Sequence, residues 1–271
     1  MRYENIRDIS IPKIGFGTWR IGGESRADPS QDARSLAALH SALELGYTHF
    51  DTAEAYAAGH AEELLGHAIR SSGLSRDALF ITSKVSPEHL GYADVLRSCG
   101  NCLRSLGMDY HDLYLIHWPG RGMHLADSFR GLNQLVADGR VRHLGVSNFN
   151  RNLLEEAVAL SETPLLTNQV SYSMADHTCV ENGVLATCQE KDILLTAYSP
   201  VKRRVINGNK PLRELARQRG VTSQQVALAW LVQQPRVITI PMSFNPLHQA
   251  ENLAAADIDL TEADLAPFLR E

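Results

Sequence analysis

The sequence has no long apolar run and no excess of basic residues. Its longest apolar stretch, Val226 to Val232, is far shorter than the ~20 residues that a membrane-spanning helix needs. The charged N-terminus does not resemble a signal peptide. The formal net charge of −5 provides no positive field that would attract nucleic acid. We therefore expect a cytoplasmic protein that has neither a membrane nor a nucleic acid as its partner.

Cysteine is also scarce, and only one pair has a suggestive spacing. Cys99 and Cys102 are separated as in metal-binding and disulfide motifs, but no second pair follows them. The same two residues share the apolar stripe of an amphipathic helix with Val95 and Leu106. We therefore expect both thiols to pack as small apolar groups, and we favour this interpretation over a redox or metal site.

Low-complexity segments, internal repeats and linkers are absent as well. The chain has 271 residues, of which 44% are hydrophobic and 21% are charged, and this composition supports a large core. A single α/β barrel is usually ~250 residues long. We predict one domain that spans residues 1–271.

Short apolar segments alternate with helical patterns along the chain. Glycine, which often terminates a helix, follows the first three helical patterns at Gly46, Gly73 and Gly107. Such alternation is typical of a parallel sheet and predicts a (β/α)8 TIM barrel with an N-terminal strand or hairpin. Two additional helices are expected, at 223–233 and near the end, where Asp259-Leu-Thr-Glu262 resembles a helix N-terminus. The predicted strands are 12–17, 47–51, 79–84, 112–117, 142–147, 165–170, 193–198 and 236–241.

Three ionisable residues stand at the ends of consecutive predicted strands. Lys84 lies 33 residues after Asp51, and His117 lies 33 residues after Lys84, which is about the length of one strand, one helix and two loops. In a barrel the carboxyl ends of the strands open into one mouth, where the active site lies. Tyr56, five residues after Asp51, is near enough to reach it. We interpret the four as a catalytic group, although each alone could be structural: an ion pair, a core histidine or a packing tyrosine.

Residues of these types, in this order, closely resemble the strand ends of the aldo-keto reductase superfamily. The resemblance is to its short, bacterial-type members, such as diketogulonate and aldehyde reductases. It covers essentially the whole chain and implies NAD(P)H-dependent reduction of small aldehydes or ketones to alcohols. Further matching segments are Gly15-Phe-Gly-Thr-Trp19, Phe50-Asp-Thr-Ala-Glu-Ala-Tyr56, Ile81-Thr-Ser-Lys84, Leu115-Ile-His-Trp-Pro119, Gly145-Val-Ser-Asn-Phe149, Asn168-Gln169, Ala197-Tyr-Ser-Pro200 and Ile240-Pro241.

The chemistry of carbonyl reduction suits these side chains. Negative charge develops on the carbonyl oxygen, so the site needs a proton donor and a polarising neighbour. We predict that Tyr56 is the acid and that the ammonium of Lys84 lowers the pKa of Tyr56. Asp51 would fix Lys84 and keep it protonated. His117 would donate a hydrogen bond to the substrate oxygen and orient it.

The resemblance also implies a nicotinamide cofactor that is held without a Rossmann motif. Ser147, Asn148 and Gln169 would bind its carboxamide, and Tyr198 would stack on the nicotinamide ring. Alternatively, Ser147 or Asn148 could cap a helix that starts near Asn150, and Tyr198 could pack at the barrel rim. The family's other cofactor positions correspond here to Ser199, Ser243, His248, Glu251 and Asn252.

One segment departs from the family's pattern. Asn245 and Pro246 predict a helix N-terminus whose amides could hold a phosphate. Members that prefer NADPH carry a lysine and an arginine for the 2′-phosphate, where this chain has Met242 and His248. We therefore expect NADPH as the cofactor, with NADH also accepted. A basic run, Lys202-Arg203-Arg204, could close over the pyrophosphate or be a solvated loop.

Other expectations concern the substrate and the competing functions. Trp19 and Trp118 offer aromatic walls for a small-molecule carbonyl substrate, with ordinary core packing as the alternative. Because the chain stops soon after the last predicted helix, we expect an open, permissive site. We also expect a monomer. The main alternative function is a catalytically weak nucleotide-binding module of the same fold. A metal-dependent hydrolase is less favoured, because among the histidines only His117 stands clearly at a strand end, and no metal site is predicted.

Overall fold

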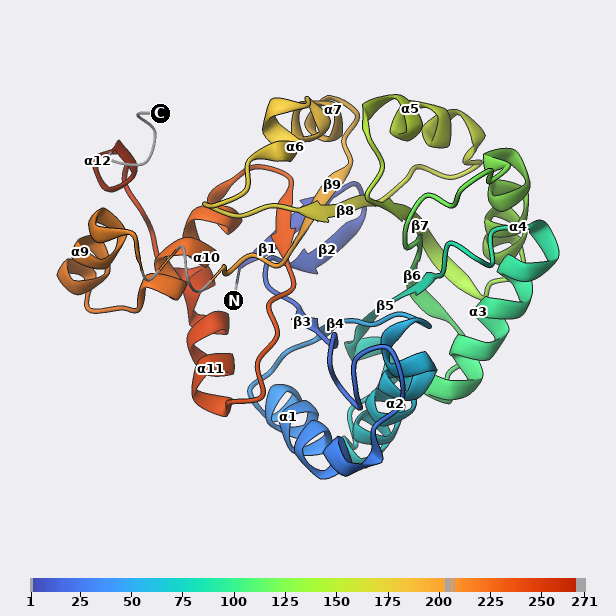
Figure 1. Cartoon of the computed structure of the whole chain (residues 1–271), viewed down its shortest axis with the longest axis horizontal. Helices are drawn as coiled ribbons and strands as arrows, with labels where there is room; N and C mark the ends of the chain where they lie inside the picture. Colours follow the sequence, from blue (N-terminus) through green and yellow to red (C-terminus); the bar gives the residue numbers. More distant parts are fainter. Residues whose placement is uncertain (1, 203–205, 207, 267–271) are drawn as a thin grey trace.

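Eight parallel strands form a barrel that helices surround (Figure 1). The computed structural model describes residues 2–202, 206 and 208–266. Each barrel strand pairs in parallel with the next one along the chain, which confirms the predicted (β/α)8 architecture. The strands are β3 (Phe16–Gly17), β4 (His49–Asp51), β5 (Phe80–Val85), β6 (His111–Ile116), β7 (Val141–Ser147), β8 (Thr167–Ser171), β9 (Leu194–Tyr198) and β10 (Val237–Thr239).

Backbone hydrogen bonds between the first and last strands close the barrel. The amide of Gly15 donates to the carbonyl of Thr239 at 2.8 Å, and the amide of Thr239 donates to the carbonyl of Lys13 at 2.9 Å. The predicted strand 12–17 is only partly regular, because residue 14 forms an isolated bridge and β3 has two residues. Glycine is needed at position 17, since a Cβ there would lie 2.7 Å from the carbonyl oxygen of Ile240.

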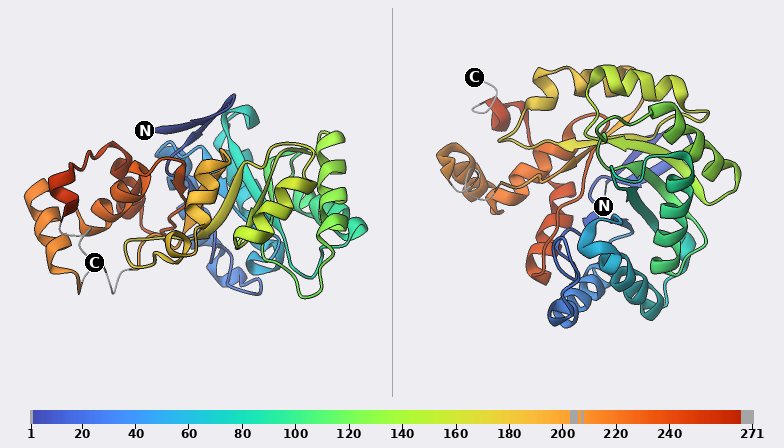
Figure 2. Two further views of the ribbon diagram at one scale, coloured as in Figure 1. Left: turned by 90° about the horizontal axis from the view of Figure 1, so that it is seen from above. Right: turned by 45° about the vertical axis from the view of Figure 1, so that its right-hand side comes forward.

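The N-terminal hairpin lies across one end of the barrel (Figure 2). It consists of β1 (Tyr3–Ile6) and β2 (Ile9–Pro12), which pair antiparallel. Ile6 and Ile11 are fully buried and pack against Leu113, Leu194 and Ile238 from the barrel strands. The hairpin therefore contributes to the barrel core, and the predicted N-terminal hairpin is confirmed.

The described helices alternate with the barrel strands, as the sequence predicts, and α9 is an addition to the prediction. The additional helix predicted at 223–233 is α10, whose bounds are Ser223–Gln233. Helix α9 was not predicted, because its sequence is strongly charged and buries only Leu212, Leu215 and Ala216. The final described helix begins within the predicted segment Asp259-Leu-Thr-Glu262, with Thr261 as its cap. The other helices are α1 (Asp32–Glu44), α2 (His60–Ser72), α3 (Tyr92–Leu106), α4 (Leu125–Ala137), α5 (Arg151–Leu160), α6 (Thr178–Glu181), α7 (Val184–Glu190), α9 (Lys210–Arg219), α11 (Pro246–Ala254) and α12 (Glu262–Leu265).

The cysteine pair lies in the core, as predicted. Cys99 and Cys102 are buried on α3 as free thiols, together with Val95 and Leu106 from the same stripe. Burial raises the pKa of Cys99 to about 12, so the thiol is protonated and unreactive at neutral pH. Within the described ranges, no helix is long and apolar enough to cross a membrane.

Candidate active site

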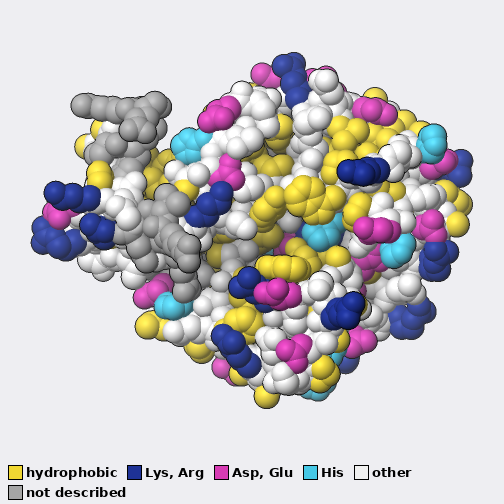
Figure 3. All heavy atoms as spheres, in the orientation of Figure 1, with side chains coloured by type: hydrophobic (Ala, Val, Ile, Leu, Met, Phe, Trp, Pro, Cys, Tyr) yellow, Lys and Arg dark blue, Asp and Glu magenta, His cyan; other side chains and the backbone are white. Residues whose placement is uncertain are grey.

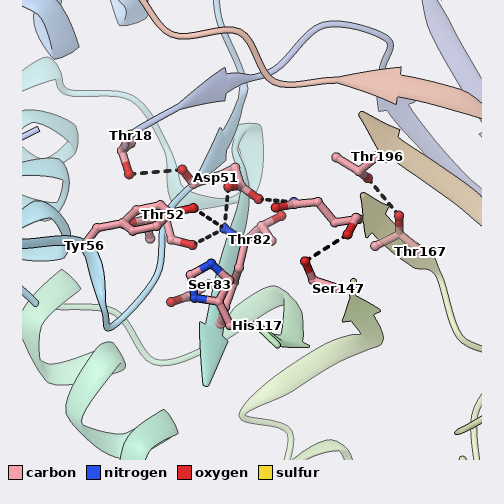
Figure 4. A network of polar contacts seen from close by, with 12 residues as sticks. Thr18, Asp51, Thr52, Tyr56, Thr82, Ser83, His117, Ser147, Thr167 and Thr196 are labelled. Carbon is pink, nitrogen blue, oxygen red and sulfur yellow. Dashed lines mark hydrogen bonds and ion pairs between the residues drawn. The ribbon is translucent and has the colours of Figure 1, made fainter. Parts of the chain in front are cut away.

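A lysine and an aspartate form a buried ion pair at the carboxyl end of the barrel strands. Asp51 ends β4, and Lys84 lies one residue before the end of the adjacent β5. Lys84 Nζ is 2.5 Å from Asp51 Oδ1 and donates to the carbonyl of Thr52 at 2.7 Å (Figure 4). Burial alone lowers the pKa of Lys84, but Asp51 and the Tyr56 hydroxyl outweigh burial and raise it. Lys84 is therefore a fixed cation.

Tyr56 begins the short 3-10 turn η2 (Tyr56–Gly59), which follows β4. Lys84 Nζ donates to its hydroxyl at 3.3 Å. The Tyr56 ring packs edge-on against Trp19 and His117, with ring centroids 5.2 and 5.5 Å away. Burial raises the pKa of Tyr56, and Lys84 acts in the opposite direction. The net direction is opposite to the prediction, because desolvation exceeds the effect of the ammonium, and Tyr56 is a neutral phenol at neutral pH.

His117 follows β6 and faces the same space as Tyr56 (Figure 4). Its backbone amide donates to the carbonyl of Val85 at 2.9 Å, which fixes the position of the residue next to β5. Burial, together with the charge of Lys84, lowers the pKa of His117 to about 3. The imidazole is therefore neutral at physiological pH and carries one N–H that can donate to a substrate oxygen.

A chain of hydrogen bonds orders the wall formed by β7, β8 and β9. Asn148 Nδ2 donates to Ser147 Oγ at 2.9 Å and to the carbonyl of His117 at 3.1 Å. Asn148 Oδ1 accepts from the hydroxyl of Tyr198 at 2.9 Å. Helix α5 is instead capped by Asn150, so the alternative role of Ser147 or Asn148 as a cap is wrong. The φ of 63° at Asn148, in the left-handed region, turns its amide toward this wall.

Gln169 joins this wall to the ion pair of Asp51 and Lys84. Gln169 Nε2 donates to Asp51 Oδ2 at 2.8 Å, and its backbone carbonyl accepts from Ser147 Oγ at 2.9 Å (Figure 4). Both oxygens of the Asp51 carboxylate are therefore engaged, one by Lys84 and one by Gln169. The carboxylate cannot rotate without breaking one of these bonds, so the ion pair has a defined geometry.

The far end of the site lies where β10 leads into α11. Asn245 caps α11 by accepting from the amide of Leu247 at 2.9 Å, and Pro246 is the first helical residue, which confirms the predicted N-terminus. Ser243 Oγ accepts from the amide of Asn245 at 3.1 Å. The predicted cofactor residues of this region all line one cavity, which also contains Ser199 and Met242: they are Ser243, His248, Glu251 and Asn252.

One cavity of about 1080 Å³ connects the catalytic group with α11. Trp19 and Trp118 stand at its rim with 44% and 47% of their surface exposed. Figure 3 shows hydrophobic side chains gathered around the middle of this face. The volume is at the upper end of the ~300–1,000 Å³ of small-molecule pockets. Its size and its mixture of polar and aromatic lining fit a dinucleotide together with a small substrate.

The cavity also contains residues that the sequence did not single out. Thr18, which belongs to the segment Gly15-Phe-Gly-Thr-Trp19, is fully buried and donates to the carbonyl of Asp51 at 3.0 Å. Arg20 has a φ of 76° and lines the rim together with Ser86 and Glu88. Loop residues of this kind have no periodic pattern in the sequence that would reveal them.

The basic run is described only in part. Lys202 forms an ion pair with Asp176 at 2.9 Å, which links the loops that follow β9 and β8. Arg203 and Arg204 lie outside the described residues. Asp176 also accepts from the hydroxyl of Ser171 at 2.7 Å, so Lys202 joins a local polar cluster.

Comparisons with known proteins agree with this geometry. Methylglyoxal reductase YeaE from Escherichia coli is 36% identical over 265 residues, which cover 96% of this chain and 90% of that protein. The crystal structure of the thermostable aldo-keto reductase Tm1743, in complex with the inhibitor epalrestat, is 41% identical with a TM-score of 0.94, over 99% of this chain and 98% of that one. An aldo/keto reductase from Klebsiella pneumoniae, in complex with NADP and acetate, is 36% identical with a TM-score of 0.87, over 96% and 91%.

The family comparison covers nearly the whole chain. The profile of the Aldo/keto reductase family matches residues 13–268. This range includes every barrel strand and the entire cavity lining. The resemblance inferred from the sequence is therefore confirmed, and the chain belongs to the aldo/keto reductase family.

Proposed function

We propose that this aldo-keto reductase reduces small aldehydes and ketones to alcohols, with Tyr56 as the general acid. The family assigns the chain to the NAD(P)H-dependent oxidoreductases. The observation that carries the proposal is that Tyr56 and the neutral His117 line one cavity, while the buried cation of Lys84 donates to the Tyr56 hydroxyl. Neither a nucleotide-sensing module nor a packing role requires these three groups together.

The proposed mechanism uses each side chain for one task. A reduced nicotinamide supplies the hydride when it is bound. His117, being neutral, donates a hydrogen bond to the substrate oxygen and orients the carbonyl. Tyr56 gives its proton to that oxygen as negative charge develops there. Lys84, held by Asp51, stabilises the phenolate that remains on Tyr56.

The cofactor would lie along the wall of β7 to β9 and reach α11. Ser147, Asn148 and Gln169 would hold the carboxamide, and Tyr198 would face the nicotinamide ring. The support for this placement is their hydrogen-bonded arrangement beside the catalytic group. Ser199 would lie at the bend after β9, and the adenosine end would contact Ser243, His248, Glu251 and Asn252, which line the same cavity.

NADPH would be the preferred cofactor, with NADH also accepted. A phosphate suits the N-terminus of α11, where the helix dipole is positive, although the amides of Asn245 and Leu247 already donate to Ser243 and Asn245. Met242 offers no charge to a 2′-phosphate, and this moderates the preference. The substrate would be a small carbonyl compound, such as the 2-oxoaldehyde in the name of the methylglyoxal reductase relative. The exposed Trp19 and Trp118 make a rim that suits varied small substrates.

We also propose that the protein is a single-domain monomer of the cytoplasm. Its described cysteines are free and buried, as is usual in a reducing compartment. Large exposed apolar side chains outside the cavity belong to separate parts of the chain, which supports a monomer. They are Tyr3, Leu45, Leu74, Val180 and Leu247.

The direct test compares the wild type with Tyr56→Phe. Initial rates of NADPH and NADH oxidation would be measured with methylglyoxal and with a reactive aromatic aldehyde. We expect the variant to lose about 10²- to 10⁴-fold in kcat while it still binds NADPH, because only the proton donor is removed. Tyr110→Phe is the matched control, since this hydroxyl bonds Asp77 on the exposed surface. Tight cofactor binding by the wild type without turnover would instead favour the nucleotide-binding module.

A further inference from the structure

Arg34 is an exposed cation that packs onto the segment leading into α11. Its Cζ atom lies 4.0 Å from the centre of the Phe244 ring. Phe244 stands between Ser243, which lines the cavity, and Asn245, which caps α11. Among residues 2–202, 206 and 208–266, no carboxylate lies within ion-pairing distance of Arg34. The acid in the same helical turn, Asp32, is bonded to His60 at 2.8 Å instead.

The position of Arg34 relative to this segment is fixed by a buried side chain. Helices α1 and α11 lie side by side (Figure 1). Gln249, fully buried on α11, donates to the carbonyls of Ala38 on α1 and Ser243 at 3.0 and 2.8 Å. Arg34 and Ala38 are four residues apart and therefore share one face of α1. The bond that ties α11 to α1 thus holds Arg34 beside the loop of Ser243 and Phe244.

Arg34 lies near the N-termini of two helices. Arg34 is the third residue of α1 and also lies over the residue that precedes the α11 cap, so it faces the positive ends of two helix dipoles. A cation placed there without an acidic partner raises the positive potential at the end of the cavity. That potential is suited to an anionic ligand group.

We propose that Arg34 binds the 2′-phosphate of NADPH and sets the preference for NADPH over NADH. The inference rests on the proposed function, which places the adenosine end beside Ser243 and α11. Arg34 would supply from α1 the cation that the chain lacks at Met242. The planar guanidinium keeps its N–H groups at the edge while its face rests on Phe244, so stacking and phosphate binding are compatible.

Calorimetric titration with 2′,5′-ADP and 5′-AMP tests the proposal without relying on activity, because the two ligands differ only in the 2′-phosphate. We expect Arg34→Gln to weaken binding of 2′,5′-ADP about tenfold and to leave 5′-AMP unchanged, as one charge-assisted contact is lost. Arg130→Gln is the matched control. Arg130 also stacks on an aromatic ring, at 4.5 Å from the centre of Tyr92, but it belongs to α4, across the barrel from α11 (Figure 1).

Further measurements separate the possible failures. If the difference in affinity between 2′,5′-ADP and 5′-AMP shrinks at high salt, this supports an ionic contact. Phe244→Leu should reproduce part of the loss of affinity for 2′,5′-ADP and leave 5′-AMP binding unchanged. Unchanged affinity of Arg34→Gln for 2′,5′-ADP would overturn the inference, as would an equal loss for both ligands. A wild type that binds neither these ligands nor NADPH would overturn the proposed function as well, whereas a defect confined to Arg34 variants leaves that function intact.

Discussion

The two ends of the cavity hold their charges in opposite ways. At the catalytic end, Lys84 and Asp51 are buried side chains with exposures of 0% and 1%, and each oxygen of the carboxylate has its own donor. At the α11 end, Arg34 is exposed and rests on an aromatic ring, with no acidic partner in the part of the chain that the structure describes. The charges of Lys84 and Asp51 are part of the barrel core, whereas the charge of Arg34 lies on the surface.

This difference indicates which property of the enzyme can change easily. A buried charge must keep its partner, because an unpaired ion in the core costs several kcal/mol. An exposed charge can be lost, gained or moved to a neighbouring helix with little effect on folding. With the roles proposed above, the chemistry of the site is tied to the fold, whereas cofactor preference can vary among proteins with the same barrel.

The largest effect is expected from breaking the buried pair. Lys84→Met leaves the Asp51 carboxylate without its cation and should lower the free energy of unfolding by about 3–5 kcal/mol. Turnover should also disappear, because Tyr56 loses the ammonium that stabilises its phenolate. Urea unfolding followed by circular dichroism measures the first effect, and the aldehyde assay measures the second.

A double variant shows whether the loss of stability comes from the unpaired charge. Asp51→Asn combined with Lys84→Met removes both charges and keeps an acceptor for Gln169 Nε2. We expect it to recover most of the stability but none of the turnover, since replacing both partners of a buried pair is often nearly neutral. Equal destabilisation in the single and double variants would mean that packing around Lys84, and not charge pairing, governs this end.

A second prediction concerns a buried acid directly outside the barrel wall. Glu62 on α2 accepts from Ser83 Oγ at 2.6 Å, and burial raises its pKa from 4.5 to about 7. Because the folded-state pKa is the higher one, the stability that Glu62 contributes is present below pH 4.5 and is lost as the pH rises through about 7.

Glu62→Gln should therefore gain stability relative to the wild type between pH 5 and pH 8, by about 2–3 kcal/mol. Unfolding free energies of both proteins at the two pH values provide the measurement. Glu156→Gln, an exposed position on α5, is the control and should show no such gain. A pH-independent difference for Glu62→Gln would show that the carboxyl ionises normally, in which case burial on this side of β5 does not exclude its charge.

The strand ends can be predicted because the sequence contains apolar segments at regular spacing. Asp51, Lys84 and His117 follow apolar segments at equal spacing, and parallel pairing necessarily brings such residues together. The competing effects on Tyr56 were not predictable, because the direction of its pKa depends on the extent of desolvation, which only the packed structure shows.

Contacts between helices that are distant in the sequence could not be predicted either. Arg34 and Phe244 are separated by most of the chain, and neither belongs to a motif. Their meeting depends on the packing of α1 on α11, which Gln249 fixes through two backbone carbonyls. Helix α9 is not evident from the sequence for a related reason. Its few apolar residues are buried by packing against neighbouring elements, which the local sequence does not show.

The smallest expected effect comes from restoring a cation at the exposed end. Met242→Lys should tighten NADPH binding by about fivefold and leave NADH binding unchanged. A single exposed charge contributes about 1 kcal/mol, and Arg34 already neutralises part of the charge of the 2′-phosphate. Met242→Leu is the uncharged control. If Arg34 and the new lysine share one phosphate, the gain should be larger in an Arg34→Gln background than in the wild type. The test is to measure dissociation constants by quenching of tryptophan fluorescence for the wild type, the two single variants and the double variant. Strictly additive effects would place Arg34 and position 242 at separate sites. No response to Met242→Lys in either background would mean that the 2′-phosphate does not bind at this end of the cavity.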